Sequence, residues 1–175
     1  TLTLSGLVGS ETLGSTNTST FNNKNVGTGK TVTVNSITLA NGSNGGLAAN
    51  YSISTGQTTT ANITAKSLTV SGITASNKTY DGNAVATLNT SSILYSGLIN
   101  GDTFSGTYTG AFNNANAGTG KTVTITPTYS GADVSNYSIT DHSTITADVA
   151  VKALTATAST ANKTYDGTTT ATTTL

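Results

Sequence analysis

Residues 21–34 read FNNKNVGTGKTVTV, and residues 112–125 read FNNANAGTGKTVTI, so one stretch occurs twice at an offset of 91 residues. In both places an Asn- and Gly-rich turn is followed by Val or Ile alternating with Thr. A period of two is typical of a β-strand that has one apolar and one polar face. The stretch therefore predicts a turn that leads into a strand, and its return predicts two similar modules.

The repetition extends along nearly the whole chain. LSGLVGSETL at 4–13 matches YSGLINGDTF at 95–104 at the same offset, and NYSI at 50–53 returns 86 residues later. NKTYDG at 77–82 returns 85 residues later. The drop in offset from 91 to 86 locates an insertion of five residues in the first occurrence. It lies in an Asn- and Gly-rich segment, which suits a surface loop.

These matches divide the chain into three parts. Residues 66–151, the second copy, form a complete repeat, and residues 1–65, the first copy, correspond to the C-terminal part of a repeat. Residues 152–175, the tail segment, start a further repeat that a segment like the first copy would complete. Two arrangements follow. Either the chain is a segment of a longer tandem array, or the tail segment of one subunit completes the first copy of the next by strand donation.

Composition argues against several kinds of partner and site. Only 8% of the 175 residues are charged and the formal net charge is zero, which argues against a nucleic-acid-binding surface. No apolar run approaches the roughly 18 residues of a membrane-spanning helix. The absence of Cys excludes disulfides and cysteine-ligated metals. We therefore expect no nucleic-acid partner, no membrane insertion, no metal and no other cofactor.

Alternation of apolar and polar residues recurs along the chain and predicts an all-β fold. It is clear in KTVTVNSITL (30–39), KTVTITPTYS (121–130), STITADVAV (143–151) and KALTATAS (152–159), and no segment has a helical period. Turn signals every 8 to 12 residues or so favour tandem Ig-like β-sandwich modules of about 85 residues. A β-grasp-like module is the alternative. Because no flexible linker separates the copies, we expect the modules to be arranged as a rod.

The most distinctive motif is Tyr-Asp-Gly. It occurs at Tyr80, Asp81 and Gly82 and again at Tyr165, Asp166 and Gly167. One carboxylate per motif falls short of the six to eight oxygen ligands of a tight calcium site. We predict a structural role instead, in which the tyrosine is buried, the aspartate bonds the turn backbone and the glycine adopts a positive φ.

Other candidate sites give weaker signals. GTGK at 27–30 and 118–121 lacks the full phosphate-loop spacing and precedes a strand, so a hairpin or bulge is predicted. His142, the only histidine, lies beside Asp141, and the first copy has no equivalent pair. Lys78 and Lys163, each with Asn and Asp nearby, are candidates for an intramolecular Lys–Asn isopeptide crosslink. We predict no catalytic residues and no enzymatic activity.

The chain resembles the YDG repeat module of very large secreted bacterial adhesins, which include proteins similar to filamentous haemagglutinin. The motifs that carry the resemblance are NKTYDG, the FNN-N-GTGKTVT stretch, NYSI and ITAKSLTV. The resemblance covers nearly all of the chain. It implies long tandem arrays that extend from the cell, and hence a secreted or cell-surface location. It implies no catalytic residues. Because repeats of this family occur in tandem, the resemblance favours the first arrangement, in which the chain is a segment of a longer array.

We therefore predict a structural segment of an extracellular bacterial filament or adhesin stalk. Its partners would be copies of itself, either as separate chains placed end to end or as neighbouring repeats of one long chain. The alternative is an adhesive module whose loops, including residues 42–46, recognise a host or cell-surface glycan or protein. Aromatic residues make up only 6% of the chain, which favours the structural role.

Overall fold

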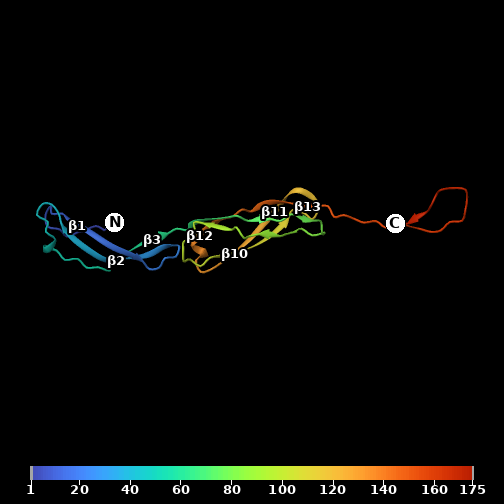
Figure 1. Ribbon diagram of the computed structural model, residues 1–175. Coiled ribbons are helices and arrows are strands. Elements are labelled where there is room, and N and C mark those ends of the chain that lie inside the picture. Colours follow the sequence, from blue (N-terminus) through green and yellow to red (C-terminus); the bar gives the residue numbers. More distant parts are fainter. Residues whose placement is uncertain (1, 175) are drawn as a thin grey trace. The chain divides into compact units, whose positions relative to one another are not determined.

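The structure of the chain is a computed structural model that describes residues 2–174 (Figure 1). Within this range the protein is all-β, with two short 3-10 helices at Ala48–Asn50 and Val134–Asn136, and no helix is long and apolar enough to span a membrane. The chain forms two compact units. Unit 1 comprises residues 2–70, 95–105 and 129–140, and unit 2 comprises residues 71–94, 106–128 and 141–174.

The first sheet of unit 1 is built from the first copy. It is antiparallel and consists of β1 (Leu13–Phe21), β2 (Gly27–Asn41) and β3 (Thr58–Ile63), with β2 in the middle (Figure 1). The strand predicted at 30–39 lies within β2, and Val34 is buried on one face of it. The alternating pattern therefore predicts this strand and its apolar face correctly.

The second sheet of unit 1 has the first strand of the second copy at its centre. β4 (Lys66–Ser71) lies between β12 (Tyr137–Thr140), to which it is parallel, and β9 (Leu94–Ser96). Leu68 and Val70 of β4 are buried. Only two residues separate β3 from β4, in line with the prediction that one copy leads directly into the next.

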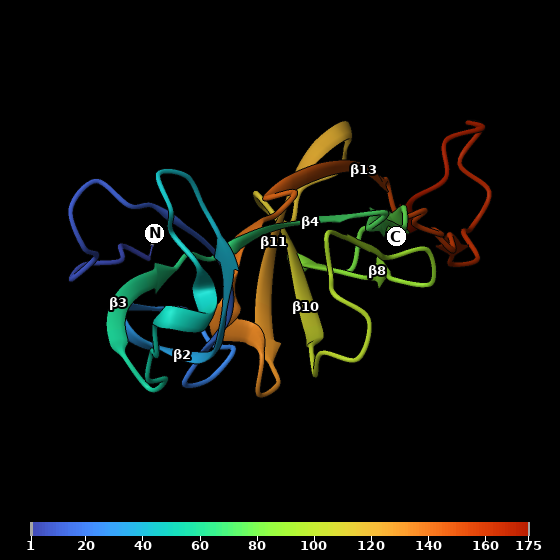
Figure 2. The same cartoon turned by 90° about the vertical axis from the view of Figure 1, so that its left-hand side faces the viewer.

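Unit 2 contains a five-stranded sheet. Its order is β6 (Lys78–Thr79), β13 (Thr144–Ala150), β11 (Gly118–Ser130), β10 (Ser105–Phe112) and β7 (Val85–Ala86), and Figure 2 shows β10 and β11 side by side. Two small sheets pair β5 (Thr74–Ala75) with β8 (Leu88–Asn89), and β14 (Ser159–Thr160) with β15 (Thr173–Thr174). The predicted strands at 121–130 and 143–151 are confirmed as β11 and β13.

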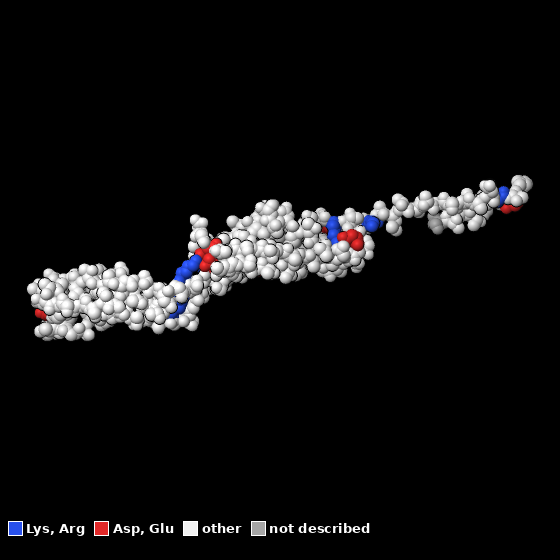
Figure 3. Space-filling model, turned by 90° about the horizontal axis from the view of Figure 1, so that it is seen from below, with Lys and Arg blue, Asp and Glu red and all other residues white. Residues whose placement is uncertain are grey.

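Charged side chains are sparse on the surface. Figure 3 shows them in a few small groups on an otherwise uncharged face. Lys24, Lys78 and Lys163 each form ion pairs with aspartates. Uncharged side chains therefore cover most of this face.

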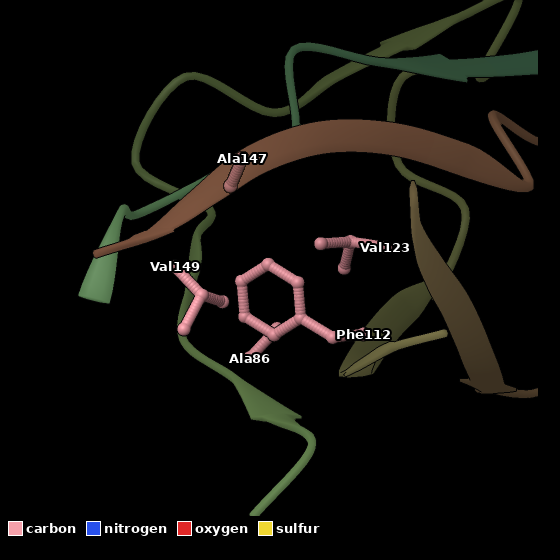
Figure 4. Close-up of a cluster of buried hydrophobic side chains, with 5 residues drawn as sticks. All are labelled: Ala86, Phe112, Val123, Ala147 and Val149. Atoms are coloured by element: carbon pink, nitrogen blue, oxygen red, sulfur yellow. The ribbon is translucent and has the colours of Figure 1, made fainter. Parts of the chain in front are cut away.

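The core of unit 2 brings the two halves of the second copy together. The buried ring of Phe112 lies among Ala86, Val123, Ala147 and Val149 (Figure 4). These residues come from β10, β7, β11 and β13, so the N-terminal half of the repeat contributes Ala86 and the C-terminal half contributes the rest. Because interiors are close-packed, loss of the N-terminal half, which supplies Ala86, would expose part of the Phe112 ring.

One predicted strand is wrong. The pattern KALTATAS predicts a strand at 152–159, but residues 151–158 are not in a strand and are exposed. A β-strand satisfies its backbone N–H and C=O groups through neighbouring strands. Within the described part of the chain no strand pairs with residues 151–158, so the sequence pattern alone does not form one.

Candidate functional site: the joint between the two copies

Lys24 connects the first copy to the second copy within unit 1. It lies in the turn after β1, and its Nζ is 2.8 Å from Asp102 Oδ1 and 2.8 Å from Asp133 Oδ1. The two carboxylates are only 11% and 10% exposed, whereas Lys24 is 66% exposed. Since two poorly hydrated carboxylates repel each other, the shared ammonium group is what allows them to lie together.

The remaining carboxylate oxygens have partners in the second copy. The Tyr137 hydroxyl donates to Asp102 Oδ2 (2.6 Å), and the Thr103 N–H donates to Asp133 Oδ2 (2.8 Å). The Ile99 N–H in turn donates to the Tyr137 hydroxyl oxygen (3.0 Å). These bonds hold both acidic side chains against the loops of the second copy independently of Lys24.

Neutral hydrogen bonds reinforce the ion pairs. The Val26 N–H donates to Asn136 Oδ1 (2.9 Å), and Asn136 Nδ2 donates to Asn25 Oδ1 (3.3 Å). A hollow of about 210 Å³ beside them is lined in part by Ile63 and Lys66. It is smaller than the roughly 300 to 1,000 Å³ of typical ligand pockets. The arrangement is therefore suited to holding two repeats together.

The charges of this cluster persist across a wide pH range. The Lys24 hydrogen bond is the main cause that holds the pKa of Asp102 and of Asp133 below the usual value, and the two carboxylates raise the pKa of Lys24. Burial, followed by the hydrogen bond to Asp102, raises the pKa of Tyr137. Around neutral pH the carboxylates stay ionised, the lysine stays protonated and the phenol stays neutral.

The first copy repeats the tyrosine part of this arrangement without the lysine. The Tyr51 hydroxyl donates to the Glu11 carboxylate, and the Val8 N–H donates to the Tyr51 hydroxyl oxygen (3.1 Å). The hydrogen bond to Glu11 raises the pKa of Tyr51. Leu47 occupies the position of Asp133. None of the ion pairs recorded among residues 2–174 includes Glu11.

The first Tyr-Asp-Gly motif forms a turn closed by a lysine. Lys78 Nζ donates to Asp81 Oδ1 (2.8 Å) and to the Val85 carbonyl (3.1 Å), and the Asn83 N–H also donates to Asp81 Oδ1 (3.1 Å). Gly82 has a φ of +82°. The predicted roles of the aspartate and the glycine are therefore seen here, and the ion pair with Lys78 lowers the pKa of Asp81.

The second motif repeats this turn. Lys163 Nζ donates to Asp166 Oδ1 (2.8 Å) and to the Thr170 carbonyl (2.8 Å), and the Thr168 N–H donates to Asp166 Oδ1 (2.9 Å). Gly167 has a φ of +73°. Thr168 takes the place of Asn83, so Lys163 bonds a hydroxyl where Lys78 bonds an amide oxygen. Lys78 and Lys163 act as turn-closing side chains, a role that their constant spacing from the aspartate could have indicated.

The family model of the YDG domain matches residues 1–61 and residues 64–147. The chain belongs to the YDG domain family. Searches among curated proteins and among solved structures found no match. Lys24 lies in the first matched YDG stretch, and both of its carboxylate partners lie in the second.

The tyrosines of the YDG motifs are not buried, and that part of the prediction is wrong. Tyr80 is 41% exposed and Tyr165 is 93% exposed. The Tyr80 N–H donates to the Ala150 carbonyl (2.8 Å), which holds the backbone of the motif beside β13. Lys78, rather than the tyrosine, lies over the core ring, with its Nζ 5.6 Å from the centre of Phe112.

The GTGK stretches form β-bulges in this YDG chain, as predicted. The pairing of β2 with β3 shifts between Gly27 and Lys30, and the pairing of β11 with β13 shifts between Gly118 and Lys121. Lys121 Nζ then donates to Asn114 Oδ1 (2.5 Å) in the preceding turn. The lysine of GTGK therefore closes the turn before the strand.

The other titratable residues do not form a reactive cluster. His142 is exposed. Within residues 2–174 no group of three or more His, Asp or Glu side chains is placed to hold a metal ion. The contacts described above join segments of the chain, and the proposal that follows is built on them.

Proposed function

We propose that this YDG chain is a structural segment of an extracellular bacterial filament or adhesin stalk, built from β-sandwich repeats joined end to end, without enzymatic activity. The observation that supports it best is the joint between the copies. Lys24 of the first copy bonds two carboxylates of the second, and β3 passes into β4 with no flexible linker. Such a joint resists separation of neighbouring repeats.

The composition of the joint suits an extracellular structural role. The two carboxylates of its ion pairs are largely covered, although Lys24 is exposed, so salt screens these pairs less than pairs in which both partners are exposed. The chain as a whole is rich in Thr, Ser and Asn, which favours solubility without charge. The resemblance to secreted bacterial adhesins supports an extracellular location.

The test is to find where the protein lies on cells that produce it. Antibodies raised against residues 2–174 should label extended filaments on intact cells, seen by immunogold electron microscopy, at many points along each filament. Label confined to the cell interior, or to cells without filaments, would contradict the proposal. Binding of the purified chain to a defined glycan, lost on deletion of residues 42–46, would favour the adhesive alternative.

A further inference from the structure

β4 of the second copy has a counterpart in the tail segment that is not in a sheet. KSLT at 66–69 matches KALT at 152–155, so Leu154 is the counterpart of Leu68 of β4. Leu68 is 0% exposed, whereas Leu154 is 92% exposed. Residues 151–158 have the alternation of a strand and no strand partner among the described residues. The tail segment therefore presents an apolar strand sequence to solvent.

The two strands that flank β4 also have unpaired counterparts. Residues 3–5 match β9 and residues 51–54 match β12, and neither segment is in a strand. We call these two the acceptor segments. They line a hollow of about 50 Å³, to which Leu4, Leu7, Tyr51 and Ile53 contribute.

The glycine that follows the first acceptor segment, Gly6, keeps the conformation that a docked strand requires. Gly97 has a φ of +99°, and a Cβ on it would lie 2.5 Å from the Ser67 carbonyl oxygen of β4, so only glycine allows β4 to approach. Its counterpart Gly6 has a φ of +87°, and a Cβ there would meet nothing within 4 Å. The backbone at Gly6 thus has the form found at Gly97, without the strand beside it.

The matching rings of Phe112 and Phe21 also differ in whether a residue from the N-terminal half of a repeat covers them. Phe112 is 4% exposed because Ala86 of β7 helps to cover it, whereas its counterpart Phe21 is 39% exposed. The residue that matches Ala86 is Ala171, which is exposed in the tail segment. The tail segment therefore carries the apolar residue whose equivalent covers this ring in the second copy.

Side-chain sizes on these surfaces are complementary. In the second copy, a Cβ on Gly110 would lie 2.7 Å from Leu88 Cδ2, so the large leucine requires the glycine. At the matching positions the first copy has Ser19 and the tail segment has Thr173. A larger residue on one side is thus offset by a smaller one on the other, as volume conservation in a packed contact requires.

We propose that the tail segment of one molecule docks on the first copy of a second molecule, with residues 152–155 inserted as a strand between the acceptor segments. The parallel pairing of β12 with β4 places Ser138 opposite Ser67, which predicts Ser52 opposite Ala153 in the docked pair. The inference rests on the proposed function and names its partner, a second copy of this chain.

The docked joint between two molecules lacks the ion pairs that Lys24 forms in the internal joint between the two copies, although Glu11 stands at the position of Asp102 and keeps its bond to Tyr51. Ala115 stands at the position of Lys24, and Leu47 stands at the position of Asp133. The contact relies on backbone hydrogen bonds and on burial of Leu154 and Phe21. Its strength should therefore change little when salt is raised, because screening acts on charge pairs.

Two variants of the 175-residue chain test the docking. Leu154→Asp places a charge on the inserted strand and leaves the acceptor segments intact, and Ile53→Asp does the reverse. By light scattering, the unaltered chain should form oligomers that grow with concentration, and each variant alone should remain at the 17.4 kDa of one chain. An equimolar mixture should form a dimer and nothing larger, because one docking event uses the only intact donor and the only intact acceptor.

The mixture also separates lost docking from lost folding. Each variant should retain the circular dichroism spectrum and thermal midpoint of the unaltered chain under conditions in which all are monomeric. A monomeric unaltered chain at every concentration, or folded variants that do not form the dimer, would overturn the docking. Filaments labelled by the antibody would in that case still support the structural function, so the two proposals can fail independently.

A crosslink tests the register. The chain has no Cys, so Ser52→Cys in one molecule and Ala153→Cys in another supply the only thiols. Oxidation should give a band of doubled mass on a denaturing gel. Ser52→Cys mixed with Thr157→Cys is the matched control, since Thr157 lies about 13 Å further along the strand at 3.3 Å per residue. A crosslink in the control alone would overturn the register.

Discussion

The second copy and the first copy differ most where β4 lies. In the second copy, β9 and β12 flank β4 and form a sheet, whereas the matching acceptor segments of the first copy are not in strands. Both copies retain the Tyr-to-carboxylate bond, through Tyr137 and Tyr51. The loops of each copy are therefore fixed by local hydrogen bonds, but the sheet needs a strand from the N-terminal half of a repeat.

The largest expected difference between the two copies concerns the central leucine. Leu68→Asp should destabilise the protein by about 4 kcal/mol or more, because it buries a charge without a partner. Leu154→Asp should change the free energy of unfolding of the monomer by less than about 0.5 kcal/mol, as expected at an exposed site. Urea unfolding at low protein concentration measures both. Equal losses would show that the exposure of Leu154 does not distinguish the two strands.

The paired phenylalanines provide the next comparison. Phe112→Ala should cost about 3 to 5 kcal/mol, because it leaves a cavity in the core of unit 2. Phe21→Ala should cost the monomer less than Phe112→Ala, since its ring is already 39% exposed. Urea unfolding of the monomeric chains gives both values. If docking covers Phe21, Phe21→Ala should also weaken oligomer formation, and a variant that oligomerises normally would argue against that contact.

The paired glycines should give a smaller difference. Gly97→Ala and Gly6→Ala both place Ala at a positive φ, which costs about 1 to 2 kcal/mol. Gly97→Ala should cost more, because its Cβ would lie 2.5 Å from the Ser67 oxygen, and Gly6→Ala should cost only the backbone strain. Thermal unfolding compares them. A larger loss for Gly6→Ala would mean that its surroundings are more crowded than the open space around Gly6 indicates.

The sequence predicts the strands that have partners within the described chain. Alternating Val and Thr locates β2 and β11, and the YDG pattern locates a turn with an aspartate and a positive-φ glycine. The same reasoning fails at residues 152–159, because strand formation depends on a neighbour that the local pattern does not contain. It also fails for Tyr80, whose exposure depends on what surrounds the turn.

The Lys24 cluster shows a different limit of sequence reasoning. Lys24 and Asp102 are 78 residues apart, so no local motif connects them. The alignment of the copies does carry a signal, since Lys24 matches Ala115 and Asp133 matches Leu47. Positions that are charged in one copy and neutral in the other therefore indicate where the contacts between repeats differ.

The smallest expected effect is on the acid stability of the joint. Asp102 and Asp133 have lowered pKa values in the folded protein, so their contribution to stability is present above the unfolded value of about 3.8 and is lost as pH falls through the folded values. Lys24→Ala removes the main cause of both shifts, so both carboxylate pKa values should rise and acid unfolding should begin at a higher pH.

Acid titration followed by NMR of the Asp side chains measures those pKa values directly. Lys152→Ala is the matched control, because it removes an exposed lysine outside the cluster and should leave the pKa values of Asp102 and Asp133 in place. The effect is confined to the internal joint, since the docked joint has Ala115 and Leu47 at the corresponding positions. Oligomer formation by Lys24→Ala should therefore match that of the unaltered chain at neutral pH. A loss of oligomers would mean that the two joints are coupled through the first copy.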